Sequence, residues 1–502
     1  MSLWISLYLP SHYLDVSFPG WPADASLLAA VLQKGQGSKD RVCACTPAAQ
    51  ARGVTPGMLR STVLGLVADI VLANDDAQAR QRHLRDTALG LLQYTPNVAF
   101  FEDQSLLLEV SASLSLFNGP RGLWRRIQAT LKNMDIHACA GMAPTAQGAW
   151  ILASHTACRR RRVLDKEALA RQLDPLPASA LPAARPYTDW LSGIGCTTLK
   201  QLRQLPREGL QQRSSPLLVQ ALDAAYGDAE DYFTWYEAPE TFSQRYDLIE
   251  RLEHVNAVLA VAERLIEQLC GWLQARQCAV SQCVLLLHHE KGRHARPPTS
   301  IVLRLSEAAW RPEDFLGVLC EQLQATTLSA PVIALDLSIA QAAPRPVASA
   351  SLFPEPAQWL RQEHRLLDLL RARLGEQRIL HARPCADYRP EQANRWQPAN
   401  DAPDTPGAPA AGAPPYQDEH ARPFWLLPHP VELDVQGNRP VYNGHPLRLI
   451  QGPERLESGW WNAQGHERRD YFIAQGRNGI RYWVYQERES LDSRWFLQGL
   501  FA

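Results

Sequence analysis

The sequence predicts a multidomain protein of mixed α/β and α+β class, followed by a small, mostly β module at its C-terminal end. Three observations lead to this prediction. The chain of 502 residues exceeds the size of about 250–300 residues at which a single core stops growing. Helical and strand patterns alternate through most of it. A Pro-, Ala- and Gly-rich segment then separates them from an end rich in Trp and Tyr.

The composition is that of a globular, nearly neutral protein. The hydrophobic content is 46% and the formal net charge is −1, which excludes a uniformly basic coat but permits local basic surfaces. No run of about 18 apolar residues occurs, so no membrane span is predicted. The ten cysteines form no CxxC pair, and we expect free thiols in a reducing cytoplasm, with no metal and no cofactor.

The N-terminal segment is informative because it lacks acidic residues. Residues Met1–Leu14 (MSLWISLYLPSHYL) have the pattern of a buried strand that runs into a turn, and they contain no Asp or Glu. Any chemistry that needs a carboxylate on this strand is therefore excluded.

The region before the Pro-rich segment predicts a compact α+β domain. Apolar residues at i, i+3, i+4 and i+7 predict an amphipathic helix over Ala260–Ala275. Strand patterns cover Val280–His288, Ser300–Leu305 and Val332–Ile339, with a helix over Pro312–Leu323 between the last two. The order helix–strand–strand–helix–strand leaves one face of the sheet free.

The end of the chain is predicted to be a separate module behind a linker. Gln397–Gln417 lacks large aliphatic residues and is predicted to be flexible. Beyond it, Asn443–Gly444 and Asn478–Gly479 are hairpin signals. The segments Arg481–Tyr485 and Arg494–Phe501 are predicted to be paired strands.

Four segments, in this order, resemble the Y-family (translesion) DNA polymerases. Ala49–Met58 (AQARGVTPGM) resembles the finger motif, and Leu107–Gly119 (LLEVSASLSLFNG) resembles the end of the palm strand and the following turn. Gly141–Ala153 (GMAPTAQGAWILA) resembles a palm helix. Leu191–Leu202 (LSGIGCTTLKQL) has the pattern of a helix-hairpin-helix, whose GIG turn can face a DNA phosphate; the alternative is a helix-capping loop.

The C-terminal end resembles the tail of the polymerase-like subunits of bacterial damage-inducible mutasomes. This resemblance rests on Gly452–Trp461, Arg469–Phe472 and Trp495–Ala502. The two resemblances together span essentially the whole chain. They imply a palm/fingers-like region at 1–155, a thumb-like region with the helix-hairpin-helix at 156–235 and a little-finger-like DNA-binding domain at 240–345. They further imply a clamp-binding segment with a helical extension at 346–396, a flexible linker at 397–419 and a partner-binding module at 420–502.

The resemblance also implies that the catalytic site is lost. Polymerase chemistry needs carboxylates that hold two metal ions about 3.5–4 Å apart. The family positions for the acidic residues fall here on Tyr8, Pro10, Gln104 and Ser105, which are uncharged. The family positions that contact the nucleotide triphosphate fall on Pro47, Gln50 and Trp150, which are also uncharged.

DNA binding is expected at the hairpin and at a basic stretch before it. Ile151–Arg207 holds ten Lys or Arg against four Asp or Glu, although a charge run is often only a solvated face. The residues expected to bind DNA are Arg159, Arg160, Arg161, Arg162, Gly193, Gly195 and Lys200.

Two further segments are candidate protein contacts. Ser349–Phe353 (SASLF) resembles a sliding-clamp peptide without its usual Gln, with Ser349, Leu352 and Phe353 as the binding residues. Alternatively, its apolar side chains pack on their own domain. In the tail, the residues expected to bind a partner, or else to form the core of a small module, are Trp460, Trp461, Arg469, Tyr471, Trp495 and Phe496.

A cluster of histidines is the remaining candidate for a site. His288, His289, Glu290 and His294 fall in a predicted hairpin turn and lack the spacing of a metal site. A polar loop is the favoured interpretation.

These patterns predict a non-catalytic polymerase homologue, cytoplasmic and associated with the nucleoid, that acts in translesion synthesis and SOS mutagenesis. The resemblance implies primer-template DNA, a sliding clamp, an error-prone C-family DNA polymerase and a RecA-like protein as partners. Two alternatives stay open. One is an active polymerase that binds metal through displaced carboxylates such as Asp15, Asp103 and Glu109; the other is an interaction hub without DNA affinity.

Overall fold

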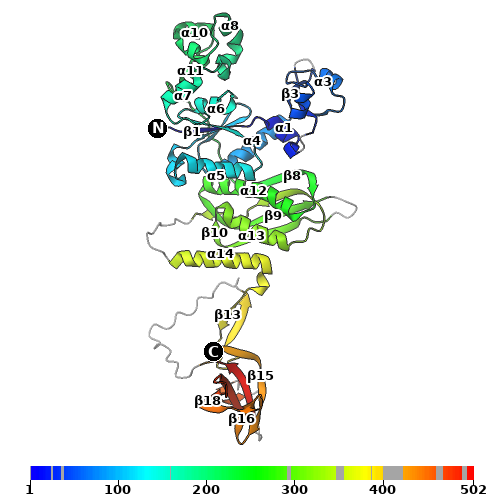
Figure 1. Ribbon diagram of the computed structural model, residues 1–502, viewed down its shortest axis with the longest axis vertical. Coiled ribbons are helices and arrows are strands. Elements are labelled where there is room, and N and C mark those ends of the chain that lie inside the picture. The colour runs from blue at the N-terminus through cyan, green and yellow to red at the C-terminus, as the bar shows by residue number, and fades with distance from the viewer. Residues whose placement is uncertain are drawn as a thin grey trace. The chain divides into compact units, whose positions relative to one another are not determined.

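The computed structural model divides into two compact units, Met1–Arg373 and Leu374–Ala502 (Figure 1). Among the described residues, no helix is long and apolar enough to cross a membrane. The structure describes residues 2–23, 26–35, 39–155, 157–158, 160–290, 296–345, 356–385, 387–398, 422–458, 467–488 and 494–501.

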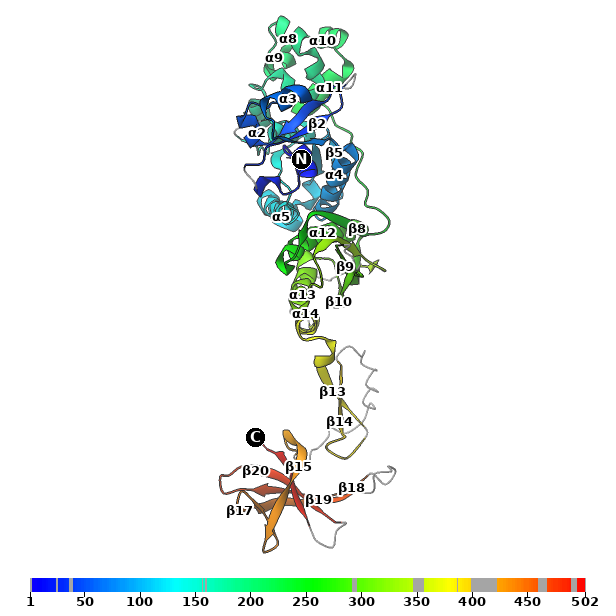
Figure 2. The same cartoon turned by 90° about the vertical axis from the view of Figure 1, so that its right-hand side faces the viewer.

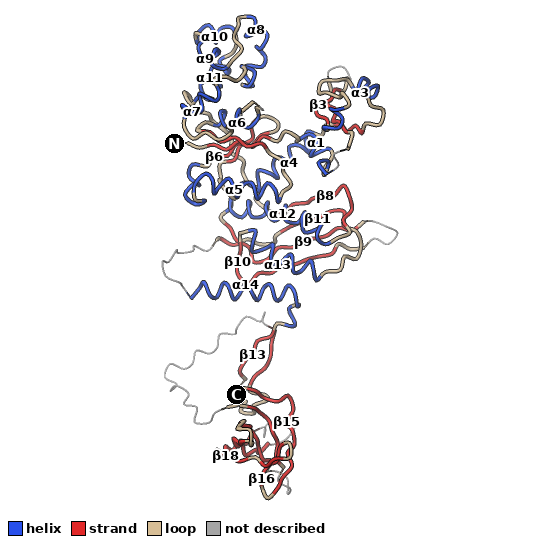
Figure 3. Tube along the Cα trace, viewed as in Figure 1, coloured by secondary structure: helices blue, strands red, loops and turns tan. Residues whose placement is uncertain are grey.

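The first unit is built around a four-stranded antiparallel sheet in the order β5-β6-β1-β7 (Figure 3). We call it the central sheet. The predicted N-terminal strand is β1, and its alternate residues Ile5 and Leu7 are fully buried. They share one hydrophobic cluster with helices α4 and α5, whereas α6 covers the opposite face. The bounds are β1 (Trp4–Tyr8), β5 (Val98–Phe101), β6 (Ser105–Glu109), β7 (Cys139–Ala143), α4 (Ala77–Leu91), α5 (Gly119–Asn133) and α6 (Ala146–Ser154), with a 3-10 helix over Ser111–Phe117.

A small three-stranded sheet, in the order β3-β2-β4, branches from this core and carries the finger-like motif. The motif spans the end of α2 and the loop after it. Gly53 and Gly57 adopt φ of 90° and 93°, a left-handed conformation that favours glycine. The bounds are α1 (His12–Ser17), β2 (Ala29–Gln33), β3 (Arg41–Cys45), α2 (Pro47–Ala51), α3 (Arg60–Leu66) and β4 (Val71–Asn74), with a 3-10 helix over Trp21–Ala23.

A helical region follows α6 and has its own apolar contacts with it. Leu169, Leu199 and Leu218, from three of its helices, are fully buried in the cluster that includes α6. The bounds are α7 (Lys166–Leu173), α8 (Thr188–Gly193), α9 (Leu199–Gln204), α10 (Arg207–Arg213) and α11 (Pro216–Tyr226), with 3-10 helices over Ala178–Ala180 and Pro182–Tyr187.

The second sheet of this unit has the order β10-β9-β11-β8, with the short β12 paired to β9. The predicted order helix–strand–strand–helix–strand is confirmed. The sequence analysis missed β8, an edge strand in which exposed residues such as Arg245 and Asp247 alternate with half-buried ones. The bounds are β8 (Ser243–Leu252), α12 (Val255–Arg276), β9 (Cys278–His289), β10 (Thr299–Ala309), α13 (Pro312–Ala325), β11 (Val332–Ser338) and β12 (Ala343–Pro344).

Helix α12 joins the central sheet to the sheet that contains β8–β12. One hydrophobic cluster runs from β1 through α4, α5 and α12 to β11. The buried carboxylate of Glu267 accepts hydrogen bonds from the Gln93 amide (2.7 Å), the Thr130 hydroxyl (3.0 Å) and the Asn133 amide (2.8 Å). These three donors belong to the central-sheet side, so α12 is held by polar as well as apolar contacts.

Helix α14 (Pro356–Leu374) covers the outer side of α13 (Figures 1 and 2). Asp368 on α14 accepts hydrogen bonds from the backbone N–H and the hydroxyl of Ser306 on β10, at 2.9 and 2.6 Å. Leu369 lies against the second-sheet cluster. The helical extension predicted after the clamp-like segment therefore packs on the second-sheet domain.

The second unit is a β module, as predicted. Its main sheet has the order β17-β16-β15-β21-β20-β19-β18. The predicted pairing of the last two strands is confirmed, and Asn443–Gly444, with φ of 53° and 74°, forms the hairpin turn between β16 and β17. The bounds are β13 (Leu380–Pro384), β14 (Asn394–Pro398), β15 (Trp425–Gln436), β16 (Arg439–Tyr442), β17 (His445–Pro446), β18 (Arg448–Ser458), β19 (Glu467–Gln475), β20 (Arg481–Glu487) and β21 (Trp495–Leu500), with a 3-10 helix over Glu376–Arg378.

Candidate functional site

The four positions that match the acidic residues of the polymerase family meet at one end of the central sheet. Tyr8 on β1 lies directly opposite Ser105 on β6. The N–H of Leu9 donates to the carbonyl of Gln104 at 2.9 Å, and Pro10 begins the turn that follows β1. The sequence analysis therefore grouped residues that the fold brings together.

Trp150 fills the space behind these positions. Its indole N–H donates to the buried hydroxyl of Ser105 at 2.9 Å, and its ring meets Phe101 edge-on at 5.4 Å between centroids. Trp150 itself is only 3% exposed. The site thus consists of aromatic rings and uncharged polar groups that satisfy one another.

A cation lies beside this cluster. The guanidinium of Arg185 is 5.8 Å from the centre of the Trp150 ring. Burial raises the pKa of Tyr8 above its usual value, with a further upward effect from Cys139 and a downward one from Arg185. A neutral tyrosine facing an arginine has nothing to offer Mg²⁺, which prefers carboxylate and carbonyl oxygens.

The carboxylates considered as displaced metal ligands lie on three different elements of the fold. Glu109 accepts hydrogen bonds from the Asn97 amide (3.3 Å) and from the N–H of Ser111 (3.1 Å). Glu109 is four residues along β6 from Ser105, which is a distance of about 13 Å. Asp103 lies in the turn between β5 and β6, and Asp15 lies on α1. Among the described residues, no group of three or more His, Cys, Asp or Glu is arranged to hold a metal ion.

The finger-like positions are also uncharged and lie at the surface. Pro47 is the first residue of α2 and is exposed, as is Gln50 one turn later. Thr46 caps this helix by accepting from the N–H of Ala49. Neither position presents a cation or a phenol to a triphosphate.

The predicted helix-hairpin-helix is formed by α8 and α9. Gly195 has φ of 77°, and Ile194 at the tip is 47% exposed. The turn differs from the expectation in one respect, because its N–H groups already have internal acceptors. Those of Ile194, Gly195 and Cys196 donate to carbonyls of α8 (2.8–3.2 Å).

The last two N–H groups of this turn are held by a side chain. Those of Thr197 and Thr198 donate to Oε1 of Gln201, at 2.8 and 3.1 Å, and Thr198 accepts in return from the Gln201 N–H to complete a capping box. A phosphate can bind these N–H groups only by replacing the Gln201 side chain. Lys200, beside them, is exposed.

The basic run extends the central sheet at its β7 edge. The N–H of Met142 donates to the carbonyl of Arg161 (2.7 Å), and the N–H of Val163 donates to the carbonyl of Met142 (2.8 Å). Arg160 and Arg162 are exposed, and Arg161 is partly buried. Arg159 lies outside the described residues.

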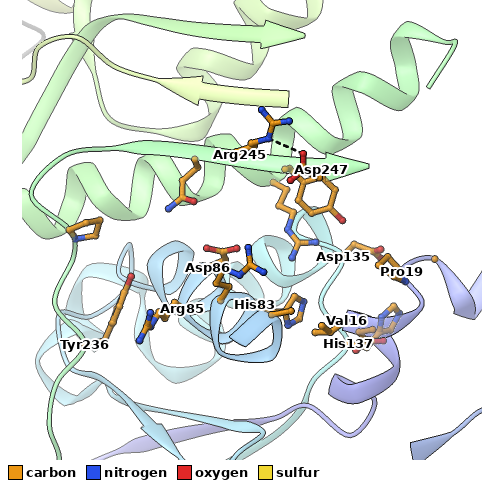
Figure 4. A pocket seen from close by; sticks show the side chains of 18 of the residues that line it. Val16, Pro19, His83, Arg85, Asp86, Asp135, His137, Tyr236, Arg245 and Asp247 are labelled. Carbon is orange, nitrogen blue, oxygen red and sulfur yellow. Dashed lines mark hydrogen bonds and ion pairs between the residues drawn. The ribbon is translucent and has the colours of Figure 1, made fainter. Parts of the chain in front are cut away.

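A polar cavity of about 600 Å³ opens between the central-sheet region and β8 (Figure 4). It was not predicted, because its walls come from segments far apart in sequence. The guanidinium of Arg264 stacks on Tyr246 at 4.9 Å. Burial raises the pKa of Asp15 and of Asp86, which both line the cavity. Charges of both signs line it, so it has no clear preference for an anionic ligand.

The open face of the second sheet carries an ion-pair network. Asp336 accepts from Nε2 of His288 at 2.6 Å and lies 3.4 Å from Arg245. His289 bonds to the Ala330 carbonyl (2.9 Å) and the Thr299 hydroxyl (2.7 Å). His288 and His289 belong to strand β9 and hold strands together, so the prediction of a polar loop is wrong for these two residues. His294 lies outside the described residues.

The candidate protein contacts fall partly outside the described residues. Those outside are Ser349, Leu352, Phe353, Trp460 and Trp461, together with most of the predicted linker.

The remaining tail candidates are mostly internal. Tyr471 and Trp495 are 1% and 3% exposed, so they form the core of the module and are not its outer surface. Arg469 is 2.9 Å from Glu391 and donates to the Tyr471 hydroxyl at 3.1 Å. Phe496 stacks on Tyr485 at 5.1 Å. The core alternative raised by the sequence is thus favoured for the first two residues.

The aromatic side chains that are accessible in the second unit were missed. Phe424, Trp425 and Trp396 are 87%, 63% and 66% exposed. Their segments flank the Pro-rich stretch and carry no motif, so only the exposure in the folded module distinguishes them.

Comparisons with known proteins found three similarities. Residues 25–154 match the impB/mucB/samB family. Two curated proteins named ImuB, from Caulobacter vibrioides strains NA1000 / CB15N and ATCC 19089 / CIP 103742 / CB 15, are each 25% identical over 479 residues, which is 90% of this chain and 100% of theirs. The crystal structure of DinB from Sulfolobus solfataricus aligns with 67% of this chain and 97% of its own, at 13% identity and a TM-score of 0.37.

The matched region and the mixed α/β core are similar to those of Y-family polymerase-like proteins, and a β-rich module follows them at the C-terminal end. Within that class the chain is ImuB-like, because the two ImuB proteins match it over nine-tenths of its length.

Proposed function

We propose that this chain is a non-catalytic DNA-binding scaffold for translesion synthesis and damage-induced (SOS) mutagenesis at the nucleoid. In this proposal the central sheet is a palm, the three-stranded sheet is the fingers, the α7–α11 region is a thumb and the second sheet is a little finger. Its task is to hold primer-template DNA and to bring a catalytically active polymerase to it.

One observation carries the non-catalytic part of the proposal. Trp150 donates its indole N–H to Ser105, opposite Tyr8, at the place where the polymerase family has a lysine and carboxylates. Two-metal catalysis needs negatively charged oxygens there. The buried indole and the Ser105 hydroxyl satisfy one another, and Tyr8 brings a phenol to this place and not a carboxylate.

The displaced-carboxylate alternative has less support. Asp15 accepts a hydrogen bond from the Trp21 indole at 2.7 Å, and Glu109 is held by Asn97 and Ser111. Two metal ions about 3.5–4 Å apart require carboxylates that converge on one point. These side chains already have local partners in different parts of the fold.

The partner assignments rest on the resemblance and on sequence motifs. The scaffold would bind the sliding clamp through Ser349–Phe353, and its C-terminal module would recruit an error-prone C-family DNA polymerase and the RecA-like protein ImuA. A flexible linker at 397–419 would let both contacts form together, which raises the effective concentration of each partner at a stalled fork.

Reconstituted lesion bypass tests the recruitment part. Purified C-family polymerase, clamp, RecA-like partner and this chain extend a primer past a template lesion, with and without the change Leu352→Ala/Phe353→Ala. The matched control is Leu64→Ala/Leu66→Ala on α3, where the two side chains are exposed, 41% and 53%. We expect bypass to be lost in the first variant and kept in the second. Equal bypass in both variants would remove the clamp-binding assignment.

A further inference from the structure

A continuous part of the first unit is strongly basic although the whole chain is nearly neutral. Val110–Leu164 contains eight Lys or Arg residues and a single carboxylate, Asp135. Four of these cations lie on α5 and the others in the Arg159–Arg162 run. The two groups are distant in sequence, and the fold brings α5 and residues 161–162 to one groove beside β7.

On α5 the cations form a stripe. Arg121, Arg125 and Lys132 stand at i, i+4 and i+11, and all three are exposed. With 3.6 residues per turn these positions share one side of the helix. The buried side, with Leu123 and Ile127, faces the core.

A groove connects this stripe to the arginine run. It measures about 330 Å³ and is lined by Trp124 from α5, by Arg161 and Arg162, and by the backs of β1 and β7. Trp124 borders the buried side of α5 and lies one helical turn after Arg121. The stripe, the groove and the arginine run therefore form one surface, on the α5 face and at the β7 edge of the central sheet.

The cations of this surface have no carboxylate partner. Among the described residues, no ion pair involves Arg121, Arg125, Lys132 or the arginines at 160–162. Several arginines elsewhere in the same unit do have a carboxylate partner, as Arg207 has Asp223 at 2.6 Å and Arg203 has Asp228 at 2.9 Å. Unneutralised cations in a row repel one another, and an anionic partner relieves that repulsion.

We propose that α5 and residues 160–162 form a second contact for the DNA phosphate backbone, on the face of the central sheet opposite α6. The stripe from Arg121 to Lys132 is about 16 Å long at 1.5 Å per residue. That length matches about five phosphate steps of 3.4 Å along one strand. Regular cations flanked by a groove suit a sequence-independent track. This inference rests on the proposed DNA-binding function and adds a contact to it.

Fluorescence anisotropy on the full chain tests the inference. The probes are a labelled primer-template with a single-stranded overhang, a blunt duplex and a single strand. The test variant is Arg121→Glu/Arg125→Glu/Lys132→Glu. The control reverses three exposed arginines of the β module, Arg439→Glu/Arg477→Glu/Arg481→Glu, and so has the same net charge.

We expect the test variant to bind about tenfold or more weakly than the control, and the slope of log K against log[salt] to become shallower by about 2–3. Loss confined to the duplex or to the single-strand probe identifies which form the track holds. Affinity and slope equal to those of the control would overturn the inference while leaving the proposed function intact. A wild-type chain that binds none of the probes would overturn both.

A crosslinking readout does not depend on charge. A photoreactive phenylalanine at Gln128, which is exposed and adjacent to the stripe, should attach to labelled DNA, and the same residue at Gln436 of the β module should not. Crosslinking at neither position, with DNA bound by the wild-type chain, would contradict the track.

Discussion

Ser105 is an uncharged side chain with a hydrogen-bond partner inside the central sheet. Its hydroxyl is fully buried and accepts the Trp150 indole N–H at 2.9 Å, with Tyr8 opposite. A buried hydroxyl with a partner is stable, whereas a carboxylate in the same place would need a metal ion or a cation to compensate its desolvation.

Ser105→Glu should therefore destabilise the protein by about 3–5 kcal/mol, because it buries an unpaired charge. Ser105→Ala, the control, should cost about 1 kcal/mol for the lost hydrogen bond. Urea unfolding with and without Mg²⁺ measures both. Rescue of the Glu variant by Mg²⁺ would mean that a metal site survives in the sheet.

A second residue-scale feature is the stacked pair His12 and His83, whose ring centroids are 5.2 Å apart. Burial, reinforced by Arg80, lowers the pKa of His12 to about 4. Burial, reinforced by Arg264 and His12, lowers the pKa of His83 to about 3. Both rings are neutral at pH 7 in the folded protein.

This pair should make the fold sensitive to acid. The unfolded histidines have a pKa of about 6.5, so the unfolded state binds more protons than the folded state below that pH, and stability falls as the pH falls towards 4 and 3. At pH 5 the loss is on the order of 2 kcal/mol per histidine. In urea unfolding, His12→Gln/His83→Gln should lose less stability between pH 7 and pH 5 than the wild type does.

The acidic neighbours do not obscure this test. The pKa values of Asp15 and Asp86 are raised by burial, which acts in the opposite direction, but both carboxylates are present in wild type and variant alike. An identical loss between pH 7 and pH 5 in the two proteins would contradict the assignment to the histidines.

At the scale of elements, α9 decides whether the hairpin can bind phosphate. Gln201 occupies the N–H groups of Thr197 and Thr198 at the start of that helix. Gln201→Glu completes a stronger capping box and places a negative charge where the phosphate would bind. We expect DNA affinity to fall by about 1 kcal/mol, or roughly fivefold in Kd, without loss of stability.

The control for the hairpin is Gln204→Glu, the same charge change at the exposed C-terminal end of the same helix. An equal effect of the two changes on affinity would indicate general charge repulsion and not a phosphate contact at the turn.

The joint between α12 and α4 depends on close backbone approach. A Cβ added at Gly271 would overlap the carbonyl oxygen of Leu89. Gly271→Ala should therefore separate the helices and cost about 2 kcal/mol or more. Gly209→Ala on α10, where nothing lies near the added atom, should instead stabilise by up to about 1 kcal/mol. Thermal unfolding compares the two, and a neutral Gly271→Ala would show that the joint is loose.

Elements with strong local signals were predictable and the joint was not. The helix at 312–323 and the Asn-Gly hairpin follow from periodicity and turn chemistry, and they appear as α13 and the β16–β17 turn. Helix α12 buries Glu267 and Gln268, polar residues that its amphipathic pattern assigns to solvent. Only the packing of a second domain against that face explains their burial.

The candidate site was predictable to a similar degree. Alignment with family motifs identified Tyr8 and Ser105, because both lie on regular strands where register fixes the pairing. It could not identify the role of Trp150, whose hydrogen bond forms across the sheet face, nor the exposure of Trp425. Tertiary contacts decide both.

At the scale of the whole molecule, the proposed scaffold binds primer-template DNA but does not extend the primer. In the proposed function, the basic surface, the hairpin and the second sheet of the first unit would hold nucleic acid, while Trp150 fills the space behind Tyr8 and Ser105. The most direct measurement is primer extension on a damaged template with purified protein, four nucleotides and Mg²⁺ or Mn²⁺, alongside a gel shift on the same DNA. The account predicts a shifted complex and no extension, and extension above background would contradict it.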